Sequence, residues 1–388
     1  MNITRFLRSV MGKFFDNTEA LFSYDYQSSK NKIDSFPMPK DDIDRSVFQY
    51  LCTMSRMPLY KRIVLNIASL IVFLPYYILM RLKNVGLKKV HKFDAVFFTD
   101  RISEDTIPNS LRKKYKEIVC VKYGEHMSLD KIDSKFVWNI VLNRPFSPYF
   151  NLKVMMKIGM ISSCIRCYEP QVIIHYSESS FATSIASHYC EEKKISYIGI
   201  MHGERLFSLK LPFFRCTEYY AWDEDYVALL KSMRCEESQF RVEVPQSLIL
   251  PDYSNTKNPR YDYTFYLQIE TDDSLQKLKK VLVAMKNRGY NLSIRPHPLS
   301  DMAAYNSSFG EYNIEDPRMI TLKQSFMDTK YVVSKFSTVL YQAWYLGIDI
   351  VIDDYTVPDL YRKLNNLGYV MIKKPHRKLS EIMREVEI

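Results

Sequence analysis

Short apolar segments alternate with helix-like segments along most of the chain after residue 92, and this alternation constrains the fold more than any other feature. Strand-like runs occupy 94–99, 117–123, 171–176, 195–201 and 219–222. Helical patterns lie between some of them, at 151–166 and 180–193, and Asp223 is placed as an N-cap after the last run. Strands that alternate with helices in this way favour parallel βαβ units.

A second series of the same kind follows a segment with the composition of a linker. Residues 250–263, LPDYSNTKNPRYDY, contain two prolines and many polar turn residues. Beyond it we expect strands at 263–269, 291–294, 331–334, 349–352 and 370–373, and helices at 272–288, 338–346 and 379–386. The sequence therefore predicts an α/β fold class with two Rossmann-like domains facing a cleft, with sites at the carboxyl ends of the strands.

The predicted organisation has four parts. Residues 1–92 form a helical, basic, membrane-associating region, and residues 93–250 form a first Rossmann-like domain. Residues 251–262 are the linker, and residues 263–388 form a second Rossmann-like domain. The seven cysteines of the 388 residues are too few, and odd in number, for a disulfide scaffold.

The positive charge is concentrated at the N-terminal end. Residues 1–92 hold 15 Lys and Arg against 7 Asp and Glu, a net charge of +8, whereas the whole chain carries +10. Such an asymmetry indicates a polyanion or an anionic membrane as partner. The excess clusters around apolar segments and does not extend over a fold face, so we expect no nucleic acid.

Two apolar segments favour the membrane. The first has bulky apolar residues at helical spacing, interleaved with basic ones: Ile3, Phe6, Leu7, Val10, Met11, Phe14 and Phe15, with Arg5, Arg8 and Lys13. The second, 63–80, is uncharged and basic on both sides, but it is shorter than the roughly 20 residues that cross a bilayer. We expect a peripheral or monotopic attachment to the cytoplasmic face of an inner membrane. A buried helix of a cytoplasmic protein is the alternative for 63–80.

The sharpest local motif is Arg295-Pro296-His297-Pro298, directly after the predicted strand 291–294. The two prolines stiffen the turn and fix the directions of its charged side chains. A guanidinium and an imidazole at the end of a strand can bind a phosphate or donate a proton to a leaving phosphate. Arg295 is therefore a candidate phosphate ligand and His297 a candidate catalytic residue. The alternative is a rigid turn with surface charges.

A second motif, Ser334-Lys335-Phe336-Ser337-Thr338, ends the strand 331–334 and opens a helix. Ser337 and Thr338 are good capping residues, and the unpaired N–H groups of a helix N-terminus bind anions. Ser334, Ser337 and Thr338 are therefore candidate phosphate-binding residues. Simple capping is the alternative interpretation.

The third motif is His202-Gly203-Glu204, at the end of the strand 195–201. Glu178 stands at the end of the preceding strand, 171–176. Carboxyl ends of neighbouring parallel strands meet at one edge of a sheet, so either carboxylate or the imidazole can act as a general base there. His202, Glu178 and Glu204 are the candidates, and the sequence does not decide among them.

Several other chemistries lack their motifs. The chain contains no G-x-G-x-x-G, G-x-x-x-x-G-K-[ST] or H-E-x-x-H run, which counts against dinucleotide oxidoreductases, P-loop NTPases and zincins. Cys164 and Cys167 have the spacing of half a zinc site but no second pair. We expect no metal site and no cofactor.

Taken in order, a His-Gly after one strand, RPHP after another, and a Ser-rich turn running into STVLYQAWYLGIDIVI resemble GT-B glycosyltransferases of bacterial surface-polysaccharide assembly. The likeness covers about residues 94–375 and is strongest to CMP-sugar users, the sialyltransferases and capsule Kdo transferases, and to CDP-glycerol glycerophosphotransferases. The resemblance implies that His297 contacts the donor phosphate and assists the departure of CMP, and that Ser337 and Thr338 grip that phosphate. It implies an essential role for His202. The acidic-acidic-Gly motif that holds the sialyltransferase base is absent.

The function that this resemblance implies is metal-independent, inverting transfer of a sugar from a nucleotide donor to a glycan or lipid-linked acceptor. The product is capsule, lipopolysaccharide or O-antigen, and the donor is CMP-linked, of sialic acid or Kdo type. The alternatives are a CDP-glycerol-type polyol-phosphate transferase, a UDP- or GDP-sugar transferase, and a non-catalytic membrane-bound component of polysaccharide assembly or export.

Overall fold

The computed structural model describes residues 25–85, 89–100, 102–250 and 259–387. The chain divides into two compact units, and each is described by itself. Unit 1 runs to His202 and resumes over Phe207–Gln246; unit 2 comprises Gly203–Leu206 and Ser247–Ile388. The amphipathic helix predicted over 3–15 lies outside the described residues, as does most of the predicted linker.

Unit 1 is built on a six-stranded parallel sheet in the order β2-β1-β3-β4-β5-β6. The strands are β1 (Ala95–Phe98), β2 (Ile118–Val121), β3 (Val172–His175), β4 (Ser196–Ile200), β5 (Glu218–Ala221) and β6 (Phe240–Val242). Five of them were predicted, and the short edge strand β6 was not. All four residues of β1 are buried, with Ala95 and Phe97 in one core cluster and Val96 and Phe98 in another. Both faces of the sheet are therefore covered, as parallel sheets require.

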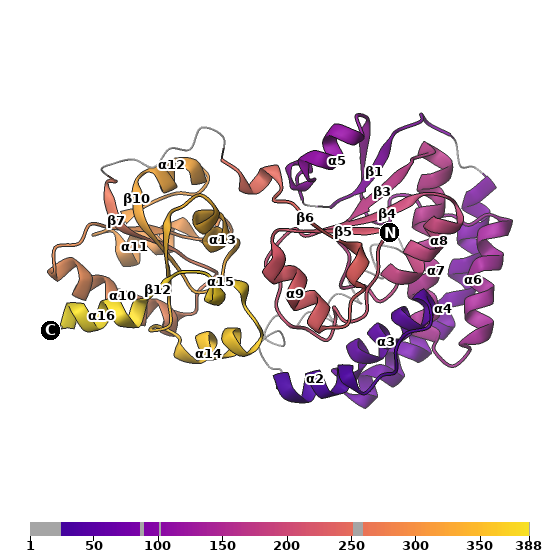
Figure 1. Ribbon diagram of the computed structural model, residues 1–388, viewed down its shortest axis with the longest axis horizontal. Helices are drawn as coiled ribbons and strands as arrows, with labels where there is room; N and C mark the ends of the chain where they lie inside the picture. Colours follow the sequence, from indigo (N-terminus) through magenta and orange to yellow (C-terminus); the bar gives the residue numbers. More distant parts are fainter. Residues whose placement is uncertain (1–24, 86–88, 101, 251–258, 388) are drawn as a thin grey trace. The chain divides into compact units, whose positions relative to one another are not determined.

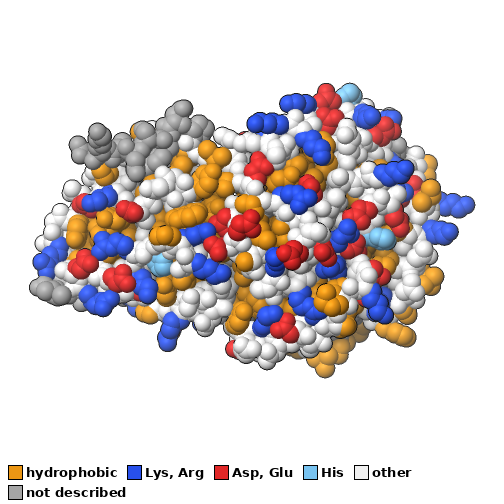
Figure 2. All heavy atoms as spheres, in the orientation of Figure 1, with side chains coloured by type: hydrophobic (Ala, Val, Ile, Leu, Met, Phe, Trp, Pro, Cys, Tyr) orange, Lys and Arg blue, Asp and Glu red, His pale blue; other side chains and the backbone are white. Residues whose placement is uncertain are grey.

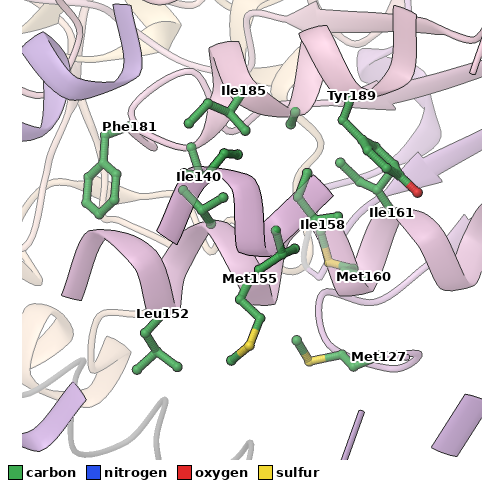
Figure 3. Packing of buried hydrophobic residues seen from close by; sticks show 14 of the residues in the cluster. Met127, Ile140, Leu152, Met155, Ile158, Met160, Ile161, Phe181, Ile185 and Tyr189 are labelled. Carbon is green, nitrogen blue, oxygen red and sulfur yellow. The ribbon is translucent and has the colours of Figure 1, made fainter. Parts of the chain in front are cut away.

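The helices of unit 1 are α2 (Tyr26–Asp34), α3 (Asp42–Ser55), α4 (Leu59–Val85), α5 (Asn109–Lys114), α6 (Lys131–Asn143), α7 (Pro148–Tyr168), α8 (Thr183–Glu192) and α9 (Glu224–Ser232), with one-turn helices η2 (Glu104–Thr106), η3 (Glu237–Gln239) and η4 (Gln246–Leu248). Most of them form two layers on one face of the sheet, whereas α5 helps to cover the other face. Helix α7 is buried around most of its circumference and packs against α4, α6 and α8. Figure 3 shows its side chains Leu152, Met155, Ile158 and Ile161 among residues of α6 and α8.

The uncharged segment 63–80 lies within the long helix α4. By length and composition alone α4 could cross a membrane, but such helices also occur in the cores of soluble proteins, and 28% of its most apolar stretch is buried against unit 1. Helices α2–α4 belong to the same compact unit as the first sheet, so the boundary predicted at residue 92 falls inside unit 1.

Unit 2 is built on a second six-stranded parallel sheet, in the order β12-β11-β10-β7-β8-β9. The strands are β7 (Tyr261–Tyr266), β8 (Leu292–Arg295), β9 (Asn313–Ile314), β10 (Thr329–Ser334), β11 (Asp349–Ile352) and β12 (Arg377–Lys378). The helices are α10 (Asp272–Asn287), α11 (Met302–Phe309), α12 (Leu322–Met327), α13 (Thr338–Tyr345), α14 (Pro358–Asn366), α15 (Val370–Lys373) and α16 (Leu379–Glu387). Numbered within the unit, the strand order is 6-5-4-1-2-3, that of the dinucleotide-binding Rossmann fold.

The strand predicted at 370–373 is wrong. These residues form the short helix α15, with Val370 and Met371 fully buried, and the last strand is the polar pair Arg377–Lys378. A four-residue apolar run looks the same in a buried strand and in a buried helical turn, so periodicity could not separate the two.

The predicted fold class is confirmed: α/β, with two Rossmann-like sheets in two units and a helical N-terminal region. The cleft expected between the two sheets stays a prediction.

Candidate functional site

The strand order of unit 2 brings the two phosphate motifs to one edge of its sheet. Strand β7 lies between β10 and β8, and all three run parallel. The turns that follow them therefore emerge side by side, with those after β8 and β10 about 10 Å apart, two strand spacings. Along the sheet, the sequence order of the strands reverses between β7 and β10. The carboxyl ends of these two strands are therefore the switch point, where open α/β sheets bind ligands.

His297 stands in the turn after β8 and is half-buried. Its ring nitrogen Nδ1 accepts a hydrogen bond from the backbone N–H of Leu299 at 3.2 Å. Since Nδ1 is the acceptor, the proton of a neutral ring sits on Nε2. The turn thus presents an N–H donor on a ring that the Leu299 bond orients.

Helix α13 begins at Thr338, in the turn after β10, and Ser337 is its N-cap. The Ser337 hydroxyl accepts from the N–H of Val339 at 3.2 Å, and the Ser337 N–H reaches the hydroxyl of Tyr369 at 3.3 Å. Ser337 and Thr338 are half-buried. The first turn of α13 supplies the partial positive charge and N–H donors that suit an anion.

Two of the predicted phosphate ligands have protein partners instead. The guanidinium of Arg295 is buried; its Nη1 lies 3.1 Å from Glu315 Oε2 and its Nη2 donates to the carbonyl of Ile320 at 2.8 Å. Ser334 is also buried, and its hydroxyl donates to the carbonyl of Tyr266 at 2.7 Å. Arg295 and Ser334 are thus bonded to groups of unit 2, and their assignment as phosphate ligands stays a prediction.

An ion pair that the sequence analysis missed spans the switch point. Lys335, in the turn after β10, lies 2.5 Å from Glu270, in the turn after β7, and also contacts the hydroxyl of Ser274. The side chains of Lys335 and Glu270 are 11% and 6% exposed. The lysine charge is therefore neutralised within the protein. The available signal was the position of Glu270, between the predicted strand 263–269 and the predicted helix 272–288.

In unit 1 the strand order reverses between β1 and β3, and an aromatic row follows the edge from there. The ring of Phe98 stacks on Tyr123 at 5.4 Å, Tyr123 meets Tyr176 edge-on at 5.6 Å, and Tyr176 lies 4.7 Å from the imidazole of His202. The hydroxyl of Tyr176 accepts the N–H of Asp100 at 3.2 Å. His202 is half-buried, and its ring lies at the end of this row.

Glu178 differs from His202 because it is buried, at 2% exposure. Its backbone carbonyl accepts the side-chain amide of Gln49 on α3 at 2.8 Å, and the same amide donates to the carbonyl of Lys210 at 2.7 Å. The N-terminal helix α3 thus fixes the loop that carries Glu178. Glu204 is half-buried, in the short segment that groups with unit 2.

A buried polar chain lies beneath the Glu178 loop. Lys157 Nζ on α7 lies 2.7 Å from the hydroxyl of Ser177, which is 3.1 Å from Nδ1 of His175; Nε2 of His175 is 3.5 Å from the thiol of Cys216. Burial lowers the pKa of Lys157 to about 7, aided by the nearby charge of Lys153. Burial also lowers the pKa of His175. The chain therefore favours neutral groups, and it was not predicted from the sequence.

Metal ligands do not gather at either edge: the described part of the chain contains no group of three or more His, Cys, Asp or Glu residues placed to hold an ion.

No family model and no curated protein matches this chain. Among solved structures, it is similar to a putative UDP-N-acetylglucosamine 2-epimerase from Listeria monocytogenes, with 10% identity and a TM-score of 0.45 over 77% of this chain and 87% of that one. It is also similar to the wall teichoic acid polymerase TagF with CDPG, with 11% identity and a TM-score of 0.44 over 84% and 88%. A third is the glycotransferase of kitacinnamycin, with 11% identity and a TM-score of 0.41 over 77% and 90%. Likenesses at this level of identity carry no functional assignment.

Proposed function

We propose that this protein is a metal-independent, inverting glycosyltransferase that uses a CMP-linked sugar, of sialic acid or Kdo type, to extend a bacterial surface polysaccharide. Unit 2 binds the donor at the edge that carries His297 and the N-terminus of α13. Unit 1 binds the glycan or lipid-linked acceptor at the edge that carries His202.

One observation carries the choice of donor: both cations of the two phosphate motifs are already paired. Arg295 is neutralised by Glu315, and Lys335 is neutralised by Glu270. The groups left for a ligand are the Nε2–H of His297 and the N–H groups of α13, which are neutral donors. A CMP-linked sugar presents one phosphodiester with one negative charge, whereas a nucleoside diphosphate donor presents two. Neutral donors and a helix dipole suit the single charge better.

The reaction follows from these groups. The bond between the anomeric carbon and the phosphate oxygen breaks, and CMP leaves with that electron pair. His297 donates its Nε2 hydrogen bond to the departing phosphate, whose developing charge the α13 N-terminus stabilises. The acceptor hydroxyl oxygen forms the new bond to the anomeric carbon from the opposite face, and its proton passes to a base on unit 1.

Accessibility favours His202 as that base. A general base must come within hydrogen-bond distance of the acceptor hydroxyl, and His202 is half-buried and not enclosed. Glu178 is almost fully buried, so we assign it to the support of the loop. Glu204 is the remaining candidate, and the His202→Ala and Glu204→Gln variants distinguish the two.

The first experiment is a thermal-shift titration of the purified full chain with CMP, CDP, UDP and GDP. A ligand at 100 times its Kd stabilises the folded state by about 2.7 kcal/mol. We expect CMP to raise the melting temperature most, and His297→Ala to abolish most of that rise. His91→Ala is the matched control, since His91 is 65% exposed and lies in unit 1.

A preference for CDP would replace the donor with a CDP-linked polyol, and a preference for UDP or GDP would replace it with a diphosphate sugar. Glu270→Gln tests the reason for the choice, because it releases the charge of Lys335 at the switch point. We expect it to strengthen binding of CDP relative to CMP. If no nucleotide binds, the proposal fails and a non-catalytic role in polysaccharide assembly takes its place. Binding of CMP followed by release of CMP from CMP-sialic acid or CMP-Kdo, lost in His202→Ala, would establish the transferase.

A further inference from the structure

One side of α4 presents a continuous apolar surface. Between Leu59 and Leu82, every residue of α4 that is exposed is apolar, and the large side chains among them are 49–68% exposed. This set, which we call the α4 face, consists of Leu59, Tyr60, Ile63, Val64, Ile67, Ala68, Leu70, Ile71, Leu74, Pro75, Ile78 and Leu82. At 1.5 Å per residue it extends over about 35 Å. Soluble monomers rarely expose an apolar patch beyond a few hundred Å², so this face needs an occupant.

The opposite side of α4 is fixed to the protein. Leu65, Phe73, Tyr76 and Met80 are buried in the main core of unit 1, and α4 packs along α7. The contact is close, because a Cβ added to Gly159 of α7 would lie 2.6 Å from the sulfur of Met80. A helix held in this way cannot cross a bilayer, since the sheet and its polar groups would have to enter the hydrocarbon with it. It can lie along an interface.

The charges around the α4 face are of one sign. Lys61 and Arg62 stand at its N-terminal end, and Arg81 and Lys83 at its C-terminal end. No Asp or Glu occurs in the sequence between Asp44 and Asp94. Apolar side chains flanked by basic ones match the acyl boundary and the head groups of anionic lipids. Apolar side chains project at the lower right margin of the molecule in Figure 2, in the part of the view where Figure 1 labels α3 and α4.

We propose that the α4 face docks unit 1 on an anionic lipid bilayer, with α4 lying parallel to the membrane in the head-group region. A second copy of the chain fits less well. Two α4 faces paired antiparallel would bring the basic residues of one end against those of the other, with no carboxylate on either helix to compensate. This inference rests on α4 alone and does not depend on the transferase proposal.

The test is co-sedimentation of the full chain with vesicles of phosphatidylcholine containing about 30% phosphatidylglycerol. We expect binding that weakens at least tenfold in Ile67→Glu with Ile71→Glu, in pure phosphatidylcholine, and in about 0.5 M NaCl. Met319→Glu with Val283→Glu is the matched control, since both residues are exposed apolar positions of unit 2. Equal binding of wild type and the α4 variant would overturn the proposal. So would a stable dimer, without vesicle binding, that the same variant dissociates. Circular dichroism checks that each variant is folded.

The orientation has its own test. Ile63→Cys, Ile71→Cys and Ile78→Cys are labelled one at a time with an environment-sensitive fluorophore in a Cys120→Ser background, because Cys120 is the one exposed cysteine. Lipid-attached quenchers then report the depth of each label. A helix lying flat places all three within a few Å of the same depth. A spanning helix would separate the labels at 63 and 78 by about 20 Å, and that result would refute the parallel orientation.

Discussion

Lys157 should make the stability of unit 1 depend on pH between 7 and 10. The residue is 8% exposed on α7, and its Nζ contacts the Ser177 hydroxyl and two tyrosine rings, at 5.5 Å from that of Tyr123 and 5.8 Å from that of Tyr197. The other titratable groups around it are Glu178, His175, Lys153, Cys190 and Cys216. Lys157→Met keeps the length of the side chain and removes the amine.

The magnitude follows from the lowered pKa of Lys157. Burial brings that pKa from 10.5 to about 7, which corresponds to a penalty of roughly 5 kcal/mol on the charged native state. Below pH 7 Lys157 is protonated in both the folded and the unfolded chain, so the full penalty is subtracted from the free energy of unfolding. Between pH 7 and 10.5 the unfolded chain binds more protons, and stability rises with pH. The stability gap between Lys157→Met and wild type should therefore shrink by about 3 kcal/mol from pH 6.5 to 9.5.

The assay is urea unfolding at four pH values across that range, followed by tryptophan fluorescence. A Trp344→Phe background confines the signal to Trp138 and Trp222, which both lie in unit 1. Lys113→Met, on the surface of α5, is the matched control and should keep the wild-type pH dependence. A stability gap between Lys157→Met and wild type that stays constant within 1 kcal/mol would refute the reasoning. Lys157 would then carry the same charge in the folded and the unfolded chain at every pH of the series.

Three further changes test the packing and polar contacts of the two units by denaturant unfolding. Gly159→Ala should destabilise unit 1 by about 1–3 kcal/mol, because the new methyl group meets Met80; a neutral result would mean that α4 shifts freely on α7. Glu315→Gln should cost about 3–5 kcal/mol, because it leaves the Arg295 charge buried and unpaired, whereas replacing both partners by Met should cost far less. Gln49→Leu should cost about 1–3 kcal/mol, because two carbonyls lose their donor; an unchanged midpoint would show that water takes its place.

The strands and caps show which parts of the fold local sequence determines. Nine of the twelve strands in the described part of the chain were predicted, because a fully buried parallel strand is a short apolar run that helical segments separate. The three that were missed, β6, β9 and β12, are edge strands of three, two and two residues. Asp223 caps the helix that it was expected to cap, since a cap needs only its own side chain and the next three N–H groups.

The candidate site shows what local sequence does not determine. His297 and Ser337 lie where their motifs placed them, because a turn after a strand and a helix cap are both local. Whether Arg295 is available to a ligand depends on Glu315, 20 residues further on, which reaches it only because β9 pairs with β8. Whether the charge of Lys335 is paired depends in the same way on β7 and β10 being neighbours, because its partner Glu270 lies 65 residues earlier in the sequence. A basic residue at a strand end therefore indicates a phosphate site only after the sheet order has been used to find its acidic partner. In unit 2 that search leaves the imidazole of His297 and the N-terminus of α13 as neutral hydrogen-bond donors, and this is why we propose a donor with a singly charged phosphate.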